Sequence, residues 1–125
     1  MTLLNTRPIP KRGEIWLINF DPTIGTEIKK TRPGVIISSD AAGKLPIKLT
    51  APITDWKSYF ANNLWHVKIN PNKINGLNKV SVVDTLQLRG LDTRRFIRKI
   101  GNLSETKITE ITIAISEAGT ARSQL

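Results

Sequence analysis

Short apolar runs rich in β-branched residues, each followed by a turn signal, occupy most of residues 14–100 of this 125-residue chain. Runs of this length suit strands better than helices, and Asn, Asp, Pro and Gly punctuate the segments between them. The pattern predicts strands over residues 14–20, 34–39, 47–53, 64–69, 80–88 and 96–100. Such a chain folds mainly as β-sheet, and the close spacing of its turns favours a small barrel.

The run over residues 47–53 carries the clearest alternation. It places four apolar side chains on one predicted face, those of Ile47, Leu49, Ala51 and Ile53. A period of two is typical of a half-buried strand. Of the connecting segments, residues 23–33 form a basic loop, and residues 55–63 form a long polar loop or a short helix.

The period changes from Ser104 onward, which predicts a C-terminal helix closing the barrel. Ser104 is suited to cap the helix, and Leu103 before it to pack on Ile108. Gly119 is expected to end the helix. The apolar residues of the helix recur at helical spacing, at Ile108, Ile111 and Ile115.

Length and composition favour one small domain in a reducing compartment. We expect a tail over residues 1–10, a folded domain over residues 11–118 and a second tail over residues 119–125. The chain contains no cysteine, so disulfides and thiolate metal sites are excluded. It lacks an apolar run long enough to span a bilayer and a secretory signal at its start, so a cytoplasmic location is expected.

The formal net charge of +9 indicates which class of molecule the protein is suited to bind. A positive field of this size attracts polyanions, among which nucleic acid, or an acidic protein that resembles it, is favoured. The alternative is that the charge only maintains solubility. Membrane binding has less support, because it usually depends on a basic amphipathic helix and none is evident.

Four segments together resemble one known family, in their order and in their spacing. They are Arg12-Gly13-Glu14-Ile15-Trp16; Asp21 to Glu27 followed by Thr31-Arg32-Pro33; Ala51-Pro52-Ile53-Thr54; and Ser81-Val82-Val83, Gln87 and Arg89 with Lys99 to Leu103. With these segments the chain resembles the MazF/PemK toxins over nearly its whole length.

The resemblance implies a fold, an activity and partners. It implies an SH3-like β-barrel with a C-terminal helix, forming a homodimer. It also implies a metal-independent, sequence-preferring endoribonuclease that cleaves single-stranded RNA without a cofactor, as the toxin of a type II pair with a cognate antitoxin. The residues matched here by Arg32 and Thr54 carry the reaction in that family.

The chemistry of RNA cleavage fits these residues. The 2′-hydroxyl is the nucleophile, so the protein must assist its deprotonation, stabilise the phosphorane and protonate the leaving oxygen. A single histidine excludes a two-histidine pair within one subunit, and the scattered carboxylates form no metal motif. Arg32 suits the phosphorane, although a surface arginine paired with Glu27 is the alternative.

Thr54 is expected to donate a hydrogen bond to a phosphate oxygen; without the resemblance it would be only a turn residue. Glu27 is a candidate to accept the 2′ proton or orient Arg32, or else a solvated loop glutamate. Further RNA contacts are expected from basic side chains, at Lys29, Lys30 and Arg89.

Three more residues are candidates for RNA contact, each with a plain alternative. Trp56 follows Thr54 and is suited to stack on a base, or else to pack in the core. His66 is predicted to face outward beside Lys68, where a surface histidine is the favoured interpretation. Asp84 lies two residues before Leu86, which stands where the family often has a carboxylate, so Asp84 is a substitute if both share a strand face.

Two other functions remain open at this point. One is a toxin that inhibits DNA gyrase, as the CcdB family does on a related fold. The other is a barrel that binds RNA without cleaving it. An antitoxin for a basic groove is expected to be an acidic, partly disordered peptide that folds across the groove and competes with RNA.

Overall fold

The computed structural model describes residues 8–20, 31–42 and 45–123. Seven strands precede one C-terminal helix: β1 (Glu14–Asn19), β2 (Thr31–Ile36), β3 (Ile47–Asp55), β4 (His66–Ile69), β5 (Ser81–Asp84), β6 (Arg89–Asp92), β7 (Phe96–Asn102) and α1 (Glu105–Ser123). Four single 3₁₀ turns lie between them: η1 (Asp40–Ala42), η2 (Ser58–Phe60), η3 (Thr85–Gln87) and η4 (Thr93–Arg95). The mainly β prediction with a terminal helix is confirmed.

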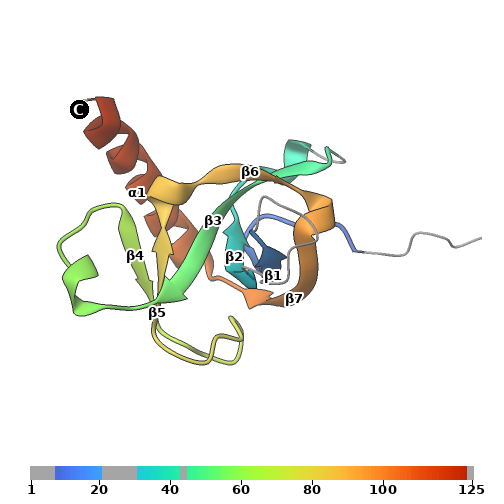
Figure 1. The fold of residues 1–125 in the computed structure, drawn as a ribbon, viewed down its shortest axis with the longest axis horizontal. Coiled ribbons are helices and arrows are strands. Elements are labelled where there is room, and N and C mark those ends of the chain that lie inside the picture. The colour runs from blue at the N-terminus through green and yellow to red at the C-terminus, as the bar shows by residue number, and fades with distance from the viewer. Residues whose placement is uncertain (1–7, 21–30, 43–44, 124–125) are drawn as a thin grey trace, which may run out of the picture.

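The strands form one antiparallel sheet in the order β4-β5-β3-β2-β1-β7, and β6 pairs with β3. Strand β3 is the longest and crosses the molecule, pairing with β2 and β6 along its first part and with β5 along its last part (Figure 1). Within the described residues no pairing joins β7 to β4, so the sheet is barrel-like and its ladder stays open.

Two apolar clusters cover opposite faces of the central strands. Ile15 of β1 and Val35 of β2 belong to the larger cluster, against which α1 packs. Their neighbours Trp16 and Ile36 belong to the smaller cluster, which Phe96 of β7 completes. Because both faces are covered, the sequences of these strands are continuous apolar runs and do not alternate between apolar and polar residues.

Of the four apolar side chains predicted to share a buried face over residues 47–53, only two are buried. Ala51 and Ile53 are buried in the larger cluster, but Ile47 is 49% exposed. In this part of β3 the opposite face is buried, with Lys48 only 2% exposed. The reason is that the strand runs beyond the larger cluster, while its other face covers the smaller cluster beside β6.

Several strand boundaries differ from the prediction, and two of the differences have a clear local cause. Strand β2 begins at Thr31 rather than at residue 34, because residues 31–33 pair with residues 17–19 of β1. Strand β5 ends at Asp84 rather than at residue 88, because the Asp84 carboxylate accepts from the backbone N–H of Leu86 and starts η3. Residues 58–60 form the 3₁₀ turn η2, in agreement with the short helix that was one alternative predicted for residues 55–63.

The helix begins where the sequence predicts and ends later. Ser104 Oγ accepts from the backbone N–H of Lys107 at 3.2 Å, which caps the first turn. Ile108 and Ile111 are buried in the same cluster as Leu103. Gly119 does not end the helix, because helical hydrogen bonding continues to Ser123. Among the described residues, no helix is both long and apolar enough to span a membrane.

A tight turn over residues 72–76 is anchored on β7. The side chains of Asn72 and Asn75 accept from each other's backbone N–H groups, and Asn75 is buried. The backbone N–H of Asn102 donates to Ile74 at 2.9 Å. At Gly101 a Cβ atom would lie 2.5 Å from backbone atoms of residues 74 and 75, so the strand needs a glycine there.

We expect Gly101→Ala to lower the free energy of unfolding by about 1–3 kcal/mol, because the backbone of the turn must move to admit a methyl group. Urea unfolding followed by circular dichroism measures this. Gly119→Ala is the matched control: nothing lies within 4 Å of its Cβ position, and a helical glycine costs about 0.5–1 kcal/mol relative to alanine, so this variant gains stability. Equal stability of the two variants would contradict the packing described.

Candidate functional site

The pairing of β2 with β3 brings together two segments that carry site candidates, residues 31–36 and 50–55. Gly34 pairs with Pro52, and Val35 pairs with Ala51. Continuing this register by two residues places Arg32 opposite Thr54. On the other side of β3, Arg89 of β6 pairs with Thr50. Thr50, Pro52 and Thr54 share one strand face, since side chains alternate.

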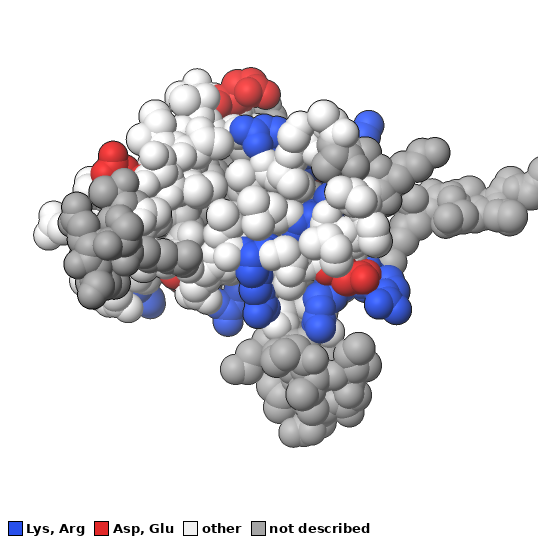
Figure 2. Space-filling view, turned by 90° about the horizontal axis from the view of Figure 1, so that it is seen from above, with Lys and Arg blue, Asp and Glu red and all other residues white. Residues whose placement is uncertain are grey.

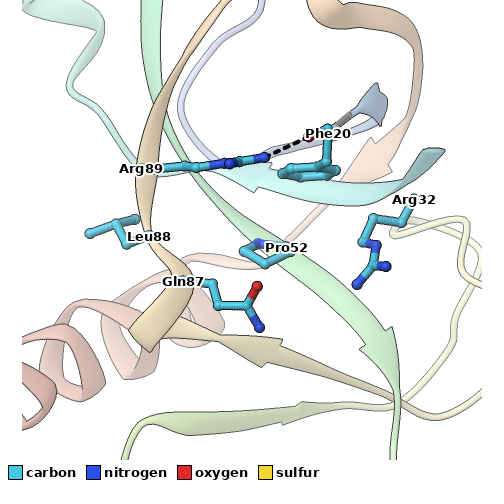
Figure 3. A pocket seen from close by; sticks show the side chains of 6 residues that line it. All are labelled: Phe20, Arg32, Pro52, Gln87, Leu88 and Arg89. Atoms are coloured by element: carbon cyan, nitrogen blue, oxygen red, sulfur yellow. Dashed lines mark hydrogen bonds between the residues drawn. The ribbon is translucent and has the colours of Figure 1, made fainter. Parts of the chain in front are cut away.

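A cavity of about 470 Å³ lies over this face. It is lined by Phe20, Arg32, Pro52, Gln87, Leu88 and Arg89. Figure 3 shows the guanidinium of Arg32 and the amide of Gln87 pointing into the same space from opposite sides, with Pro52 between them. We refer to it as the first cavity.

A second cavity, of about 510 Å³, adjoins the first one along β3. Its lining includes Thr54 and Arg32 together with the loop after β3, through Lys57, Tyr59 and Phe60. Tyr59 is 71% exposed, so its ring is open to a ligand. Arg32 therefore stands in the wall shared by both cavities, and Thr54 lines the second cavity with it.

The two arginines of the site have different surroundings. Arg89 Nη2 donates to the backbone carbonyl of Phe20 at 2.8 Å, and its guanidinium lies 5.4 Å from the centre of the Phe20 ring. These contacts fix its direction and leave further N–H groups for a ligand. Within the described ranges, the side chain of Arg32 has no hydrogen bond or ion pair to another residue, and it lines both cavities.

Basic side chains also gather on the surface. On the face shown in Figure 2, Lys and Arg lie at the centre and along the lower edge, while Asp and Glu form separate small groups. This distribution agrees with the net charge of +9 and suits a polyanion.

Three of the residues predicted from sequence, Glu27, Lys29 and Lys30, lie outside the described residues. Trp56 is half-buried; Lys68 Nζ lies 4.9 Å from its ring centre, and Phe60 packs against its edge. Trp56 lies close in the sequence to residues that line the second cavity, but the lining includes Tyr59 and not Trp56.

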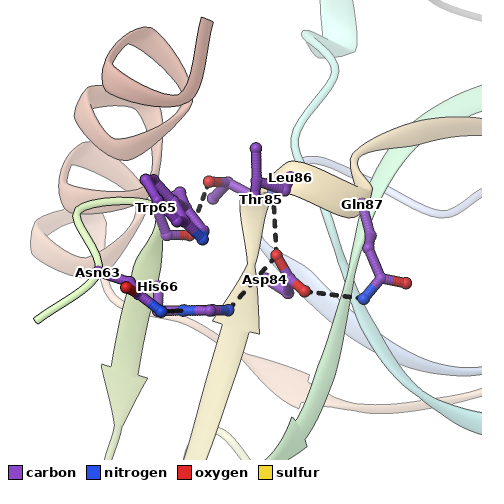
Figure 4. Close-up of polar contacts among 7 residues, drawn as sticks. All are labelled: Asn63, Trp65, His66, Asp84, Thr85, Leu86 and Gln87. Atoms are coloured by element: carbon purple, nitrogen blue, oxygen red, sulfur yellow. Dashed lines mark hydrogen bonds and ion pairs between the residues drawn. The ribbon is translucent and has the colours of Figure 1, made fainter. Parts of the chain in front are cut away.

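His66 is not the surface residue that the sequence favoured. Its side chain is only 8% exposed, because Phe60 stacks on the ring at 4.4 Å and Asn63 Nδ2 lies 3.0 Å from Nδ1. The prediction failed because residues 58–63 fold back over the start of β4. His66 Nε2 faces Asp84 of the neighbouring strand, 3.6 Å from Oδ1 (Figure 4).

Asp84 does not share a strand face with Leu86, because η3 begins between them. Its carboxylate instead accepts from Gln87 Nε2 at 2.8 Å. The idea that Asp84 substitutes for a carboxylate at position 86 by strand alternation is therefore wrong. Asp84 does not line the first cavity, but it contacts Gln87, which does.

Sequence reasoning did not propose Phe20, Pro52 or Gln87 as site residues. Pro52 and Gln87 stand within the segments that carried the family resemblance, which was the available signal. Phe20 ends the first predicted strand and gave no signal of its own. In the part of the chain that the structure describes, no group of three or more His, Asp or Glu side chains is placed to hold a metal ion.

Comparison with known proteins identifies the family. Residues 11–118 match the family model described as "PemK-like, MazF-like toxin of type II toxin-antitoxin system". The chain belongs to this family. Among its relatives, an endoribonuclease MazF from Staphylococcus epidermidis is 37% identical over 106 residues, which cover 84% of this chain and 87% of that protein.

Solved structures of the MazF/PemK family share the fold. A MazF from Deinococcus radiodurans superposes with a TM-score of 0.72 at 22% identity, covering 91% of this chain and 99% of that one. A mycobacterial endoribonuclease in complex with its cognate antitoxin superposes with a TM-score of 0.70 at 15% identity, covering 90% and 96%. At these identities the likeness concerns the fold alone.

The geometry predicts an anion site between the two cavities. We expect inorganic phosphate to shift the side-chain Nε–H NMR signals of Arg32 and Arg89 before that of Arg94, whose Nε already donates to Asp92 at 3.0 Å. The reason is that a phosphate gains most from guanidinium groups whose donors face open space. The shifts should weaken as NaCl is raised. Equal shifts at all three arginines would mean non-specific screening and no site.

Proposed function

We propose that this protein is the endoribonuclease toxin of a type II toxin–antitoxin pair, and that it cleaves single-stranded RNA without a metal ion. Family membership and relatives named endoribonuclease support the activity. The observation that carries the site is Arg32, which stands between two cavities and opposite Thr54. A dinucleotide matches this arrangement, because its two nucleosides are joined through one phosphate, as the two cavities are joined at Arg32.

In this proposal the phosphate binds at Arg32 and one nucleotide occupies each cavity. The 2′-oxygen attacks the adjacent phosphorus, and the bond from phosphorus to the 5′-oxygen breaks. The products are a 2′,3′-cyclic phosphate and a free 5′-hydroxyl, so no water is consumed. The proton lost by the 2′-hydroxyl is balanced by the proton gained by the leaving oxygen.

Arg32 supplies charge and donors, because a guanidinium remains protonated and does not serve readily as a base. Its donors stabilise the extra negative charge of the phosphorane and face the leaving oxygen. Thr54 adds one hydroxyl donor to a phosphate oxygen. Glu27 is our candidate to accept the 2′ proton, since it lies five residues before Arg32 in the sequence.

The remaining predicted residues take supporting roles in the proposal. Arg89, Lys29 and Lys30 meet RNA phosphates along the basic surface. Trp56 and the exposed Tyr59 each pack against Phe60, and both are suited to stack on bases. His66 and Asp84 are covered by neighbouring residues and act through Gln87.

We also propose a cytoplasmic location, a homodimer and a cognate antitoxin for this protein. The antitoxin is an acidic peptide that covers the two cavities, so it competes with RNA. A mycobacterial structure of the same fold is a complex of an endoribonuclease with its cognate antitoxin, which supports the existence of an antitoxin for this protein.

The decisive experiment is cleavage of a long single-stranded RNA in EDTA. The wild-type protein should give discrete fragments ending in cyclic phosphate, and Arg32→Ala should lower the rate by about 100- to 1000-fold, the usual cost of losing one preorganised charged interaction. Thr54→Val, which keeps the shape but loses the hydroxyl, should lower it by about 10- to 100-fold.

Arg98→Ala is the matched control, because Arg98 is exposed on β7 and lines neither cavity. It should retain the wild-type rate. If RNA stays intact with the wild-type protein but is retained by it, the protein is a silent RNA binder. If RNA is neither cut nor bound and DNA gyrase is inhibited, the protein is a gyrase-inhibiting toxin and the proposal is wrong.

A further inference from the structure

The side chain of Gln87 lines the first cavity, and one of its two polar atoms is already engaged. Nε2 donates to Asp84 Oδ2 at 2.8 Å. An ionised carboxylate only accepts hydrogen bonds, so the atom of the amide that faces it must be the nitrogen. The amide oxygen consequently points the other way, toward Pro52 and the cavity (Figure 3).

Asp84 is itself held in place, so the orientation of Gln87 is built into the fold. Its Oδ1 accepts from the backbone N–H of Leu86 at 3.0 Å and lies 3.6 Å from His66 Nε2. Phe60 packs on the His66 ring, and Asn63 contacts its Nδ1 atom, as Figure 4 shows for Asn63. The side chains of His66 and Asp84 are only 8% and 17% exposed, so their contact is largely shielded from water, while Gln87 itself is exposed to a ligand.

We propose that Asp84 is a positioning residue that fixes Gln87 with its carbonyl oxygen in the first cavity, where this oxygen accepts an N–H of an RNA base and so sets the base preference at one position. The inference rests on the proposed function, because it assigns a base to this cavity. It names the feature of the substrate that is read there, namely a donor on the edge of the base.

Replacing one carboxylate oxygen of Asp84 by an amide nitrogen should reverse the orientation of the Gln87 amide. In Asp84→Asn, the backbone N–H of Leu86 still needs an acceptor, so the amide oxygen of the new side chain takes the position of Oδ1. Its NH₂ group then takes the position of Oδ2 and faces Gln87. Gln87 must turn its amide over to accept from it, and it now presents an NH₂ group to the cavity.

Base chemistry converts this flip into a defined change of sequence preference. Adenine carries an amino donor where guanine carries the O6 acceptor, and cytosine carries an amino donor where uracil carries O4. The ring nitrogens of the Watson–Crick edge follow the opposite pattern within each pair. The flip therefore exchanges A for G, or C for U, whichever of these atoms Gln87 contacts, and keeps the size of the base.

The test uses binding and cleavage in parallel. The bound fraction of a randomised pool of short 2′-fluoro RNAs, which lack the nucleophile, is sequenced for each variant, and the cleavage sites of an ordinary RNA pool are mapped. We expect the wild type to prefer one base at one position by about fivefold, the factor that corresponds to one hydrogen bond. Asp84→Asn should exchange that base within its size class at the same position only.

Two further variants serve as controls. Asp92→Asn makes the same exchange in the same local role, because Asp92 caps η4 through the backbone N–H of Arg94 and contacts no residue of the cavity. It should leave every preference unchanged. Gln87→Leu removes both polar atoms and should abolish the preference at that position while binding elsewhere is retained.

The outcomes separate this inference from the proposed function. An exchange of preference in the 2′-fluoro pool without cleavage of any ordinary RNA supports the base-reading role and overturns the endoribonuclease proposal. Cleavage with identical preferences in the wild type and Asp84→Asn overturns the inference and leaves the endoribonuclease standing. If neither pool is bound or cut, the cavity is not a base site and both are wrong. Thermal unfolding of each variant checks that the fold is retained.

Discussion

The pairing register between β2 and β3 is the constraint on which the site depends. With Gly34 opposite Pro52, the next residues on the same face are Arg32 and Thr54. A slip of one residue would turn every side chain of β2 to the other face of the sheet. The register is secured because Val35 and Ile36 must enter separate apolar clusters on opposite faces. The core of the protein thus fixes the position of its candidate catalytic arginine.

Gly34 has a part in this arrangement that its sequence context did not reveal. A Cβ atom there would lie 2.7 Å from the Ile18 side chain and 3.0 Å from the Phe20 ring. The missing side chain lets Phe20 lie close to β2, where the Phe20 carbonyl accepts from Arg89. The smaller cluster and the cationic wall of the first cavity are therefore parts of one packing arrangement.

The sequence predicted the elements that depend on local patterns. Strand β1 and the start of α1 followed from an apolar run and from a capping serine, and their bounds agree with the structure to within about one residue. Arg32 and Thr54 could be named as candidates because the family resemblance covers their motifs. Proline is disfavoured within strands, so Pro33 hid the true start of β2.

The features that depend on distant residues could not be predicted. His66 is covered by residues 58–63, and no local pattern shows which way that segment folds. The alternation in β3 gave no sign that the buried face changes along the strand, because the smaller cluster that this face covers is completed by distant residues, Leu91 of β6 and Phe96 of β7. The contact between Asp84 and Gln87 arises from a 3₁₀ turn in what appeared to be a continuous strand.

The proposed function requires one phosphate to bind at Arg32, between two nucleotide-sized cavities. A crystal structure of the protein with a short RNA carrying 2′-deoxy substitutions, which cannot be cleaved, tests this directly. It should show phosphate oxygens within hydrogen-bond distance of the Arg32 guanidinium and Thr54 Oγ1, with one base in each cavity. RNA bound instead in the groove formed by Trp16, Ile97 and Arg98, with Arg32 untouched, would contradict the account.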